Sequence, residues 1–184
     1  IVGTGSDASG DFVIGDQGEM NFNSAGNLIR METTDPNEGG NDAVYSQEGP
    51  DVVLGGFGQD TLVIGADDTR DTSRDLAIGD NGFVTFQDDG TYLQMQTTQP
   101  TIGDNDSIIT GGGDDVVLGG QANDDISTGS EEDFVFGDQA LVNFDGNGTV
   151  MNATVIDPTI GGADTISSGA NRDRVFGGTS TDTI

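Results

Sequence analysis

The sequence predicts an all-β protein, a solenoid of short strands joined by glycine-rich turns and interrupted by three β-hairpin insertions. Three observations lead to this prediction. Aspartate recurs every nine residues over long stretches, with an apolar residue two positions after each. Three stretches alternate apolar and polar residues around a turn. The whole pattern repeats, since "DFVIGDQG" at Asp11 returns at Asp75 and at Asp133 with offsets of 64 and then 58 residues.

A hairpin stands early in each repeat. "GFVTFQDDGTYLQMQTT" (82–98) alternates Val84 and Phe86 with polar neighbours and then turns, and residues at about 18–34 and 140–155 repeat this pattern. Proline cannot donate to a sheet ladder, so the second strand of each hairpin is expected to end before Pro36, Pro100 and Pro158. An isolated hairpin is marginal in water. Each hairpin must therefore pack on the solenoid, on the next hairpin or on another molecule. It either covers a side or edge of the solenoid or takes part in lateral assembly between neighbouring chains.

Nonapeptides fill the rest of each repeat. Glycine-rich hexads such as "GGFGQD" (55–60) favour a turn, and the three residues after them suit a very short strand. Stacked copies would bury the apolar residue of each strand in a shared narrow core. These apolar residues are Val44, Val53, Leu62, Ile108, Val117, Ile126, Val135, Ile166, Val175 and Ile184.

The repeats define the expected organisation of the chain as one continuous solenoid. The expected segments are the end of a preceding repeat at 1–10 and repeats at 11–74, 75–132 and 133–184. The nonapeptides fall at about 37–65, 101–132 and 159–184. The last residues "DTI" followed by the first residues "IVG" read much like the internal "DTLVIG" (60–65), so we expect an excerpt of a longer array.

The composition points to cations as partners. The net charge is −28, from five Arg and no Lys against 27 Asp and six Glu, and a compact body with this charge repels itself. Asp and Gly suit turns and hard-cation sites. Nucleic acid and membrane insertion are not expected, because the chain is acidic and has no apolar run of about 18 residues. The absence of Cys and His excludes disulfides, thiol and imidazole catalysis and common zinc sites.

We expect no enzyme. Adjacent acids occur at Asp88 and Asp89, at Asp114 and Asp115, and at Glu131 and Glu132. A glycosidase needs two carboxyl groups at a fixed separation across a cleft, which adjacent turn residues do not provide.

The nonapeptides resemble the RTX, or haemolysin-type, calcium-binding repeat, whose pattern is Gly-Gly-x-Gly-x-Asp-x-apolar-x. "GGFGQDTLV" (55–63) fits throughout, whereas "SQEGPDVVL" (46–54) and "SGANRDRVF" (168–176) keep little beyond the aspartate and the apolar residue. The resemblance implies a right-handed parallel β-roll with two nonapeptides per turn. It also implies that calcium binds between copies one full turn apart, held by aspartate carboxylates and turn carbonyls, in a bacterial and extracellular setting.

Carried over by position, the resemblance gives ten candidate calcium ligands: Asp42, Asp51, Asp60, Asp106, Asp115, Asp124, Asp133, Asp164, Asp173 and Asp182. The implied pairs one turn apart are Asp42 with Asp60, Asp106 with Asp124, Asp115 with Asp133, and Asp164 with Asp182. The insert "ADDTRDTSR" (66–74) leaves the pair of Asp51 and Asp75 open, and Pro50 and Arg172 leave their own sites open. The other interpretation of each aspartate is a turn residue with an Asx hydrogen bond and no metal.

Two functional classes remain. The first is a calcium-binding structural repeat of a long secreted or cell-surface bacterial adhesin, matrix or filament-forming protein, which folds and stiffens when calcium binds outside the cell. The alternative is a calcium-dependent carbohydrate- or surface-binding module attached to a secreted enzyme. The chain has no Trp, and Tyr45 and Tyr92 are its only Tyr, which argues against sugar stacking.

Overall fold

The computed structural model describes residues 9–65 and 71–184. In these ranges every regular element is a β-strand, so the expected all-β class is confirmed. The described residues contain no helix with the length and apolar character needed to cross a membrane. The segment 1–10, expected as the end of a preceding repeat, falls almost entirely outside the described residues, as do residues 66–70 of the insert.

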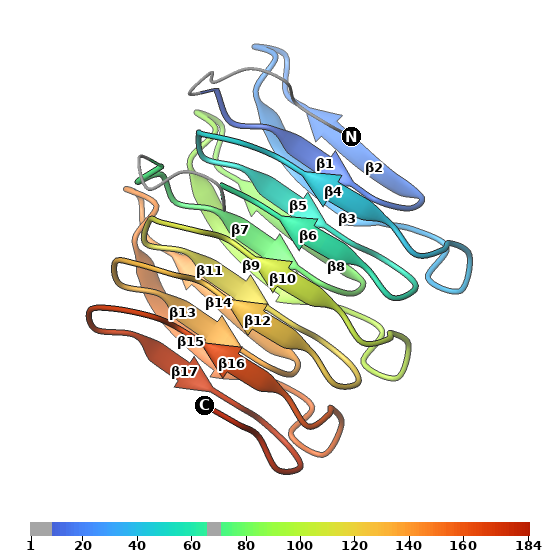
Figure 1. Cartoon of the computed structure of the whole chain (residues 1–184). Coiled ribbons are helices and arrows are strands. Elements are labelled where there is room, and N and C mark those ends of the chain that lie inside the picture. The colour runs from blue at the N-terminus through green and yellow to red at the C-terminus, as the bar shows by residue number, and fades with distance from the viewer. Residues whose placement is uncertain (1–8, 66–70) are drawn as a thin grey trace.

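The nonapeptides form two parallel sheets that lie against each other (Figure 1). Sheet A contains, in sequence order, β4 (Ala43–Tyr45), β6 (Thr61–Val63), β10 (Ser107–Ile109), β12 (Asp125–Ser127) and β16 (Thr165–Ser167). Sheet B contains β1 (Phe12–Ile14), β5 (Val52–Leu54), β7 (Leu76–Ile78), β11 (Val116–Leu118), β13 (Phe134–Phe136) and β17 (Arg174–Phe176).

The register of both sheets aligns the apolar residues that follow the aspartates. In sheet A, Ile108 lies opposite Leu62 on one side and Ile126 on the other. One core between the sheets buries eight of the ten predicted apolar residues: Val44, Val53, Leu62, Ile108, Val117, Ile126, Val135 and Ile166. Val175 is partly buried because β17 is an edge strand. Ile184 is exposed, since the chain beside it forms only an isolated bridge at Thr183.

A third, antiparallel sheet covers the other face of sheet B. Sheet C contains β2 (Gly18–Phe22), β3 (Leu28–Thr33), β8 (Gly82–Phe86), β9 (Tyr92–Thr97), β14 (Ala140–Phe144) and β15 (Val150–Val155). The pairs β2–β3, β8–β9 and β14–β15 span 18–33, 82–97 and 140–155. Neighbouring pairs are joined through β3–β8 and β9–β14, so the three pairs make one continuous sheet.

The inner strands β5, β7 and β11 of sheet B are buried on both faces because they are apolar at all three positions. β5, β7 and β11 are fully buried, whereas in β6, β10 and β12 of sheet A only the central residue is buried. The outer residues of the sheet B strands pack against Met31, Val84, Met95 and Val142 of sheet C. Sheet C therefore covers a side of the nonapeptide sheets, the first of the two arrangements that the sequence left open.

Most turns within the nonapeptide runs keep one backbone feature even where the nonapeptide departs from its pattern. In "GGFGQD", Gly56 and Gly58 have φ values of 112° and 114°, a region that glycine adopts freely. In four other turns the residue two positions before the aspartate has a positive φ although it is not glycine: Ala122 (77°), Glu131 (83°), Asn171 (88°) and Ser180 (69°). Each such residue costs roughly 1–2 kcal/mol. The turns containing Pro50 and Arg172 share this feature, at Gly49 and Asn171. The turns that follow the hairpins differ, since Gly40, Asp104 and Gly162 have no left-handed φ.

Candidate metal centre

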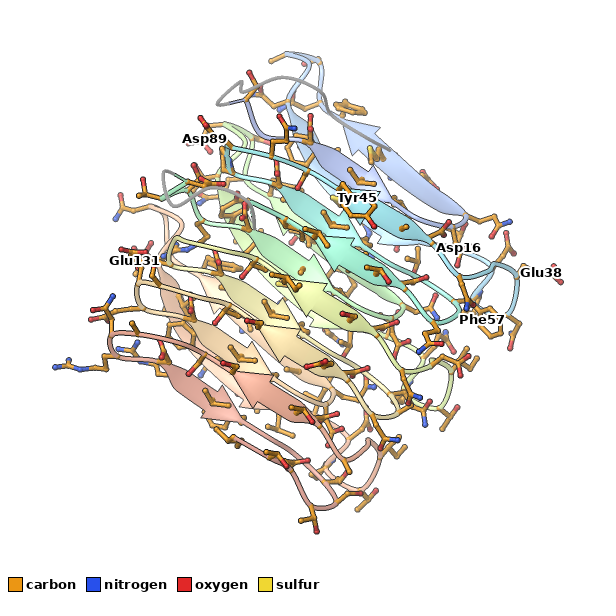
Figure 2. All side chains as sticks on the ribbon, viewed as in Figure 1. Asp16, Glu38, Tyr45, Phe57, Asp89 and Glu131 are labelled. Atoms are coloured by element: carbon orange, nitrogen blue, oxygen red, sulfur yellow. The ribbon has the colours of Figure 1, made fainter. Side chains whose placement is uncertain are left out.

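The nonapeptide aspartates form two rows, because each stands in the turn just before a strand of a parallel sheet. We call these rows of aspartates the first and second ladders. The first ladder runs along sheet A and contains Asp42, Asp60, Asp106, Asp124, Asp164 and Asp182. The second ladder runs along sheet B and contains Asp11, Asp51, Asp75, Asp115, Asp133 and Asp173. The two rows lie at opposite ends of the strands. The first row lies where the strands of sheet A begin and those of sheet B end, and the second row lies where the strands of sheet B begin and those of sheet A end. Figure 2 labels Phe57 in a first-ladder turn and Glu131 in a second-ladder turn on the opposite side of the molecule.

Hydrogen bonds join consecutive aspartates of both ladders. The backbone N–H of one aspartate donates to Oδ1 of the next, at 2.7–3.2 Å. The four pairs implied to lie one turn apart are all joined in this way. The pair that the insert left open is also formed, since Asp51 N donates to Asp75 Oδ1 at 2.9 Å.

The second carboxylate oxygen, Oδ2, is the one that remains available. Asp75 and Asp115 have no exposed surface, and the other buried members of the ladders are at most 3% exposed. Burying a polar atom without a hydrogen bond costs free energy. Oδ2 is nevertheless buried and unpartnered in seven of the described ladder residues: Asp51, Asp60, Asp75, Asp106, Asp115, Asp124 and Asp164.

Burial raises the pKa of these carboxyl groups, and neighbouring aspartates raise it further. The pKa of Asp124 rises to about 10 through burial and then the charge of Asp106. That of Asp106 rises to about 9 through burial and then Asp80, and that of Asp60 to about 7, chiefly through burial. The ionised ladders therefore require positive charge close by, which a hard cation supplies.

Within the described part of the chain, three arginines pair with carboxylates outside the ladders: Arg30 with Glu32 at 2.6 Å, Arg74 with Asp114 at 3.6 Å and Arg174 with Glu132 at 3.5 Å. Acidic side chains alone do not make a cage, because in residues 9–65 and 71–184 no three of them gather closely enough to hold a metal. A cation at the ladders must also take backbone carbonyls, which calcium accepts as readily as carboxylates.

Glycine leaves the space in front of the first ladder open. A glycine follows every strand of sheet B, at Gly15, Gly55, Gly79, Gly119, Gly137 and Gly177. A Cβ added to Gly55 would lie 2.5 Å from Asp60 Oδ2, and one on Gly15 would lie 2.8 Å from Asp42 Oδ2 and 2.5 Å from Gly55 O. Carboxylate and main-chain carbonyl oxygens thus meet where only glycine fits. This donor set and the unpartnered Oδ2 atoms fit calcium.

Near the second ladder, hydroxyl residues take the place of these glycines. They follow most strands of sheet A, at Ser46, Thr110, Thr128 and Ser168. Thr128 Oγ1 donates to Asp133 Oδ2 at 2.6 Å, which satisfies the oxygen that is unpartnered elsewhere. This hydrogen bond opposes the effect of burial, and the pKa of Asp133 rises only to about 6. The second ladder is therefore partly satisfied by the protein itself, and the first ladder is the more open to a cation.

Sequence reasoning missed two groups of aspartates near these sites. Asp11 and Asp75 complete the second ladder but were not among the ten candidates. Asp16, Asp80 and Asp138 link the loop after each hairpin to a first-ladder turn. Asp16 accepts hydrogen bonds from Gly40 N at 3.1 Å and from Phe57 N at 2.7 Å, the residue beside it in Figure 2. Their signal was present in the sequence, since they share the repeat offsets of 64 and 58 residues.

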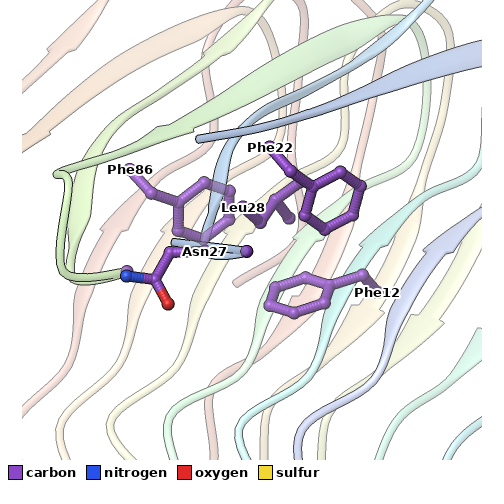
Figure 3. Close-up of a pocket in the computed structure, with 7 residues that line it drawn as sticks. Phe12, Phe22, Asn27, Leu28 and Phe86 are labelled. Carbon is purple, nitrogen blue, oxygen red and sulfur yellow. The ribbon is translucent and has the colours of Figure 1, made fainter. Parts of the chain in front are cut away.

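An apolar pocket lies at the end of sheet C beside β1 (Figure 3). Its lining includes Phe12, Phe22 and Phe86, and Asn27 contributes its polar side chain. The Asn27 amide already donates to Asp88 O at 2.7 Å. Small-molecule sites usually add several placed polar groups to an apolar lining, so this pocket lends little support to a carbohydrate-binding module.

The fold and the two ladders define an acidic repeat protein whose turns present carboxylate and carbonyl oxygens to hard cations. A family model described as the RTX calcium-binding nonapeptide repeat (4 copies) matches residues 38–69, 102–138 and 161–184, half of the chain. The chain therefore belongs to the RTX calcium-binding nonapeptide repeat family. All ten candidate aspartates lie in the matched segments, whereas Asp11 and Asp75 lie outside them. Comparisons with curated proteins and with solved structures found no match.

Proposed function

We propose that this chain is a calcium-supported β-roll solenoid with three hairpin insertions, serving as a structural segment of a long secreted or cell-surface bacterial adhesin, matrix or filament-forming protein. In this proposal it has no enzymatic activity. Calcium ions and adjacent repeats of the same polypeptide are its partners, and its setting is extracellular. Membership of a calcium-binding repeat family supports the calcium part of the proposal.

The observation that carries the proposal is the row of buried, unpartnered Oδ2 atoms facing the glycines of the first ladder. The first-ladder aspartates among the ten candidates would hold calcium through these oxygens together with turn carbonyls, and the second-ladder candidates would do so where no hydroxyl group occupies Oδ2. Calcium supplies the two positive charges that the ladders lack, and it does so only when the chain is folded. Its binding free energy therefore adds to the folding free energy.

This coupling suits a protein that works outside the cell. Where calcium is scarce, the ladder carboxylates repel one another and the chain stays largely unfolded, as export in an extended form requires. Outside, calcium at about millimolar concentration matches the affinity range of extracellular modules and shifts the equilibrium to the folded, stiff form.

Contacts between copies would use surfaces other than the apolar faces of the hairpins. Those faces pack on sheet B, and the outer face of sheet C carries polar contacts such as Gln94 Nε2 to Asn143 Oδ1 at 2.8 Å. The strands β2 and β15 stand at the edges of sheet C, and β1 and β17 at the edges of sheet B. Edge strands offer unpaired backbone groups, so they suit a neighbouring repeat that continues both sheets.

The proposal is tested by titrating the chelated chain with calcium while recording far-ultraviolet circular dichroism, with magnesium as the control. We expect a transition from coil to β-structure with calcium and little change with magnesium. A chain that is already folded in chelator at neutral pH, or that responds equally to magnesium, would refute calcium-coupled folding. Sedimentation velocity at high protein concentration tests assembly separately, and a strict monomer in calcium would remove the filament-forming role.

A further inference from the structure

The insert between Asp51 and Asp75 carries an aspartate that returns to the second ladder. The side chain of Asp71 is only 3% exposed. Its Oδ1 accepts a hydrogen bond from Ser73 N at 2.9 Å, whereas its Oδ2 is buried and has no partner. A surface turn would leave this oxygen in water, so its burial requires a compensating ligand.

The backbone of Asp71 lies in close contact with the three consecutive glycines at 111–113. A Cβ added to Gly112 would lie 2.6 Å from Asp71 O, and one added to Gly113 would overlap Ser73 O. Glycine permits this close approach because it has no side chain. The described end of the insert thus lies against the turn that precedes Asp115, and the contact holds Asp71 in place.

Three oxygen atoms converge over the open side of Gly65. An ideal Cβ on Gly65 would lie 2.7 Å from Asp71 Oδ2, 3.0 Å from Thr110 O and 3.3 Å from Asp75 Oδ2. Asp75 is completely buried, and its Oδ1 is occupied by the N–H of Asp51. Its Oδ2, like that of Asp71, is therefore free to bind a ligand. Gly65 keeps this space clear of side-chain atoms.

The neighbouring arginine does not serve as that ligand, because its hydrogen bonds lead elsewhere. Arg74 Nε donates to Asp114 O at 2.6 Å, and its Nη1 donates to Gly148 O at 2.5 Å. Two carboxylate oxygens and one carbonyl oxygen make a donor set suited to a hard divalent cation, which completes its shell with water.

We propose that Asp71 Oδ2, Asp75 Oδ2 and Thr110 O bind one further calcium ion, in addition to those at the nonapeptide turns. The family match that covers the insert ends at residue 69, so neither carboxylate belongs to a matched nonapeptide. The site lets an insert that breaks the repeat spacing contribute to the second ladder. It extends the proposed function to the insert but depends on a different carboxylate, so the two can fail separately.

The test compares the calcium stoichiometry of Asp71→Asn with that of Asp89→Asn by isothermal titration calorimetry of the whole chain after chelation. Asparagine keeps the oxygen that accepts from Ser73 N and replaces Oδ2 with an amide nitrogen. Asp89 is a matched control, because it makes the same turn hydrogen bond to Thr91 N at 3.0 Å on an exposed hairpin turn. Both variants lose one negative charge.

We expect Asp71→Asn to lose one calcium equivalent, or to bind one equivalent at least tenfold more weakly, while Asp89→Asn matches the unaltered chain. Circular dichroism in saturating calcium should show β-structure in both variants, since the ladder residues are unchanged. Equal stoichiometry and affinity in both variants would overturn the inference while leaving the proposed function intact. Failure of Asp71→Asn to fold in saturating calcium would also overturn it, by showing a structural role. If the unaltered chain binds no calcium, the proposed function fails first.

Discussion

Replacing Gly55 with alanine places a methyl group in the space in front of the first ladder. The added Cβ would lie 2.5 Å from Asp60 Oδ2 and would overlap Gly79 O, whereas real Cβ atoms essentially never show contacts under 3.0 Å. The φ angle of Gly55 is not in the left-handed region, so alanine introduces no backbone strain. Its amide still donates to Ile78 O. The substitution therefore displaces the Asp60 carboxylate and the main-chain carbonyl of Gly79, so the backbone after β7 must shift.

The expected magnitude follows from this overlap. An extra methyl group in a well-packed site typically costs about 1–3 kcal/mol. The methyl group displaces a carboxylate and a carbonyl oxygen in the folded chain. Because calcium is proposed to bind only the folded chain, this cost lowers the apparent free energy of calcium binding. Since 1.4 kcal/mol corresponds to a factor of ten, calcium should bind at this turn between about fivefold and about a hundredfold more weakly.

Calorimetric titration after chelation measures this change, with Gly146→Ala as the control. Gly146 has no atom within 4 Å of an added Cβ and no left-handed φ, so the same substitution is expected to be neutral there. If Gly55→Ala binds as many calcium ions as Gly146→Ala, with affinities within about twofold, then the open space at Gly55 is not part of a calcium site.

Asp124→Asn should weaken calcium binding at least tenfold and, in chelator at pH 8, stabilise the fold by more than about 1.4 kcal/mol, because the pKa of Asp124 is raised to about 10. The chelated chain is expected to fold only at low pH, so the measurement is the pH at which its far-ultraviolet circular dichroism loses β-structure. This pH should be higher in Asp124→Asn than in the exposed control Asp125→Asn. In chelator, stability should fall from about pH 4 towards pH 10, by up to about 1.4 kcal/mol per pH unit per carboxyl, because raised folded-state pKa values favour the fold only while the groups are protonated. Circular dichroism of the chelated chain would contradict this if its β-structure increased as the pH rose from about 4. Leu118→Ala should lower the free energy of unfolding in saturating calcium by about 2–5 kcal/mol, and exposed Leu93→Ala should lower it by less than about 0.5 kcal/mol. Equal losses in urea unfolding would argue against a core between sheets B and C.

The sequence predicted the elements that follow a fixed period. A nine-residue spacing places each aspartate before a strand and each apolar residue in the core, so Asp106 with Asp124 and Ile108 with Ile126 could be aligned without a structure. Alternation around a turn located the hairpins in the same way. Both signals are local and recur along the chain, the aspartate spacing at ten positions and the hairpin pattern at three.

The rest depended on contacts between distant segments. The apolar triplets Val52–Leu54 and Val116–Leu118 signal a strand that is buried on both faces, but nothing local says that sheet C provides the second cover. Asp71 stands outside the nonapeptide spacing, so its return to the second ladder was not visible. The residue five positions before a ladder aspartate is glycine in some turns, such as Gly119, and a hydroxyl residue in others, such as Thr128. This difference was visible in the sequence, but its consequence for the Oδ2 atoms became clear only from the structure.

If calcium binding is coupled to folding as proposed, we expect the two parallel sheets to depend on calcium to different degrees. Sheet B lies between two apolar cores and begins at the second ladder, where Thr128 satisfies a carboxylate that would otherwise need a cation. Sheet A has one buried face, buries one residue per strand in β6, β10 and β12, and begins at the ladder whose Oδ2 atoms face open glycines. The free energy of calcium binding thus acts most directly on the layer with the least apolar burial of its own. The hairpins of sheet C add buried apolar area on sheet B and leave the first ladder uncovered, so the proposed calcium response is compatible with the third layer.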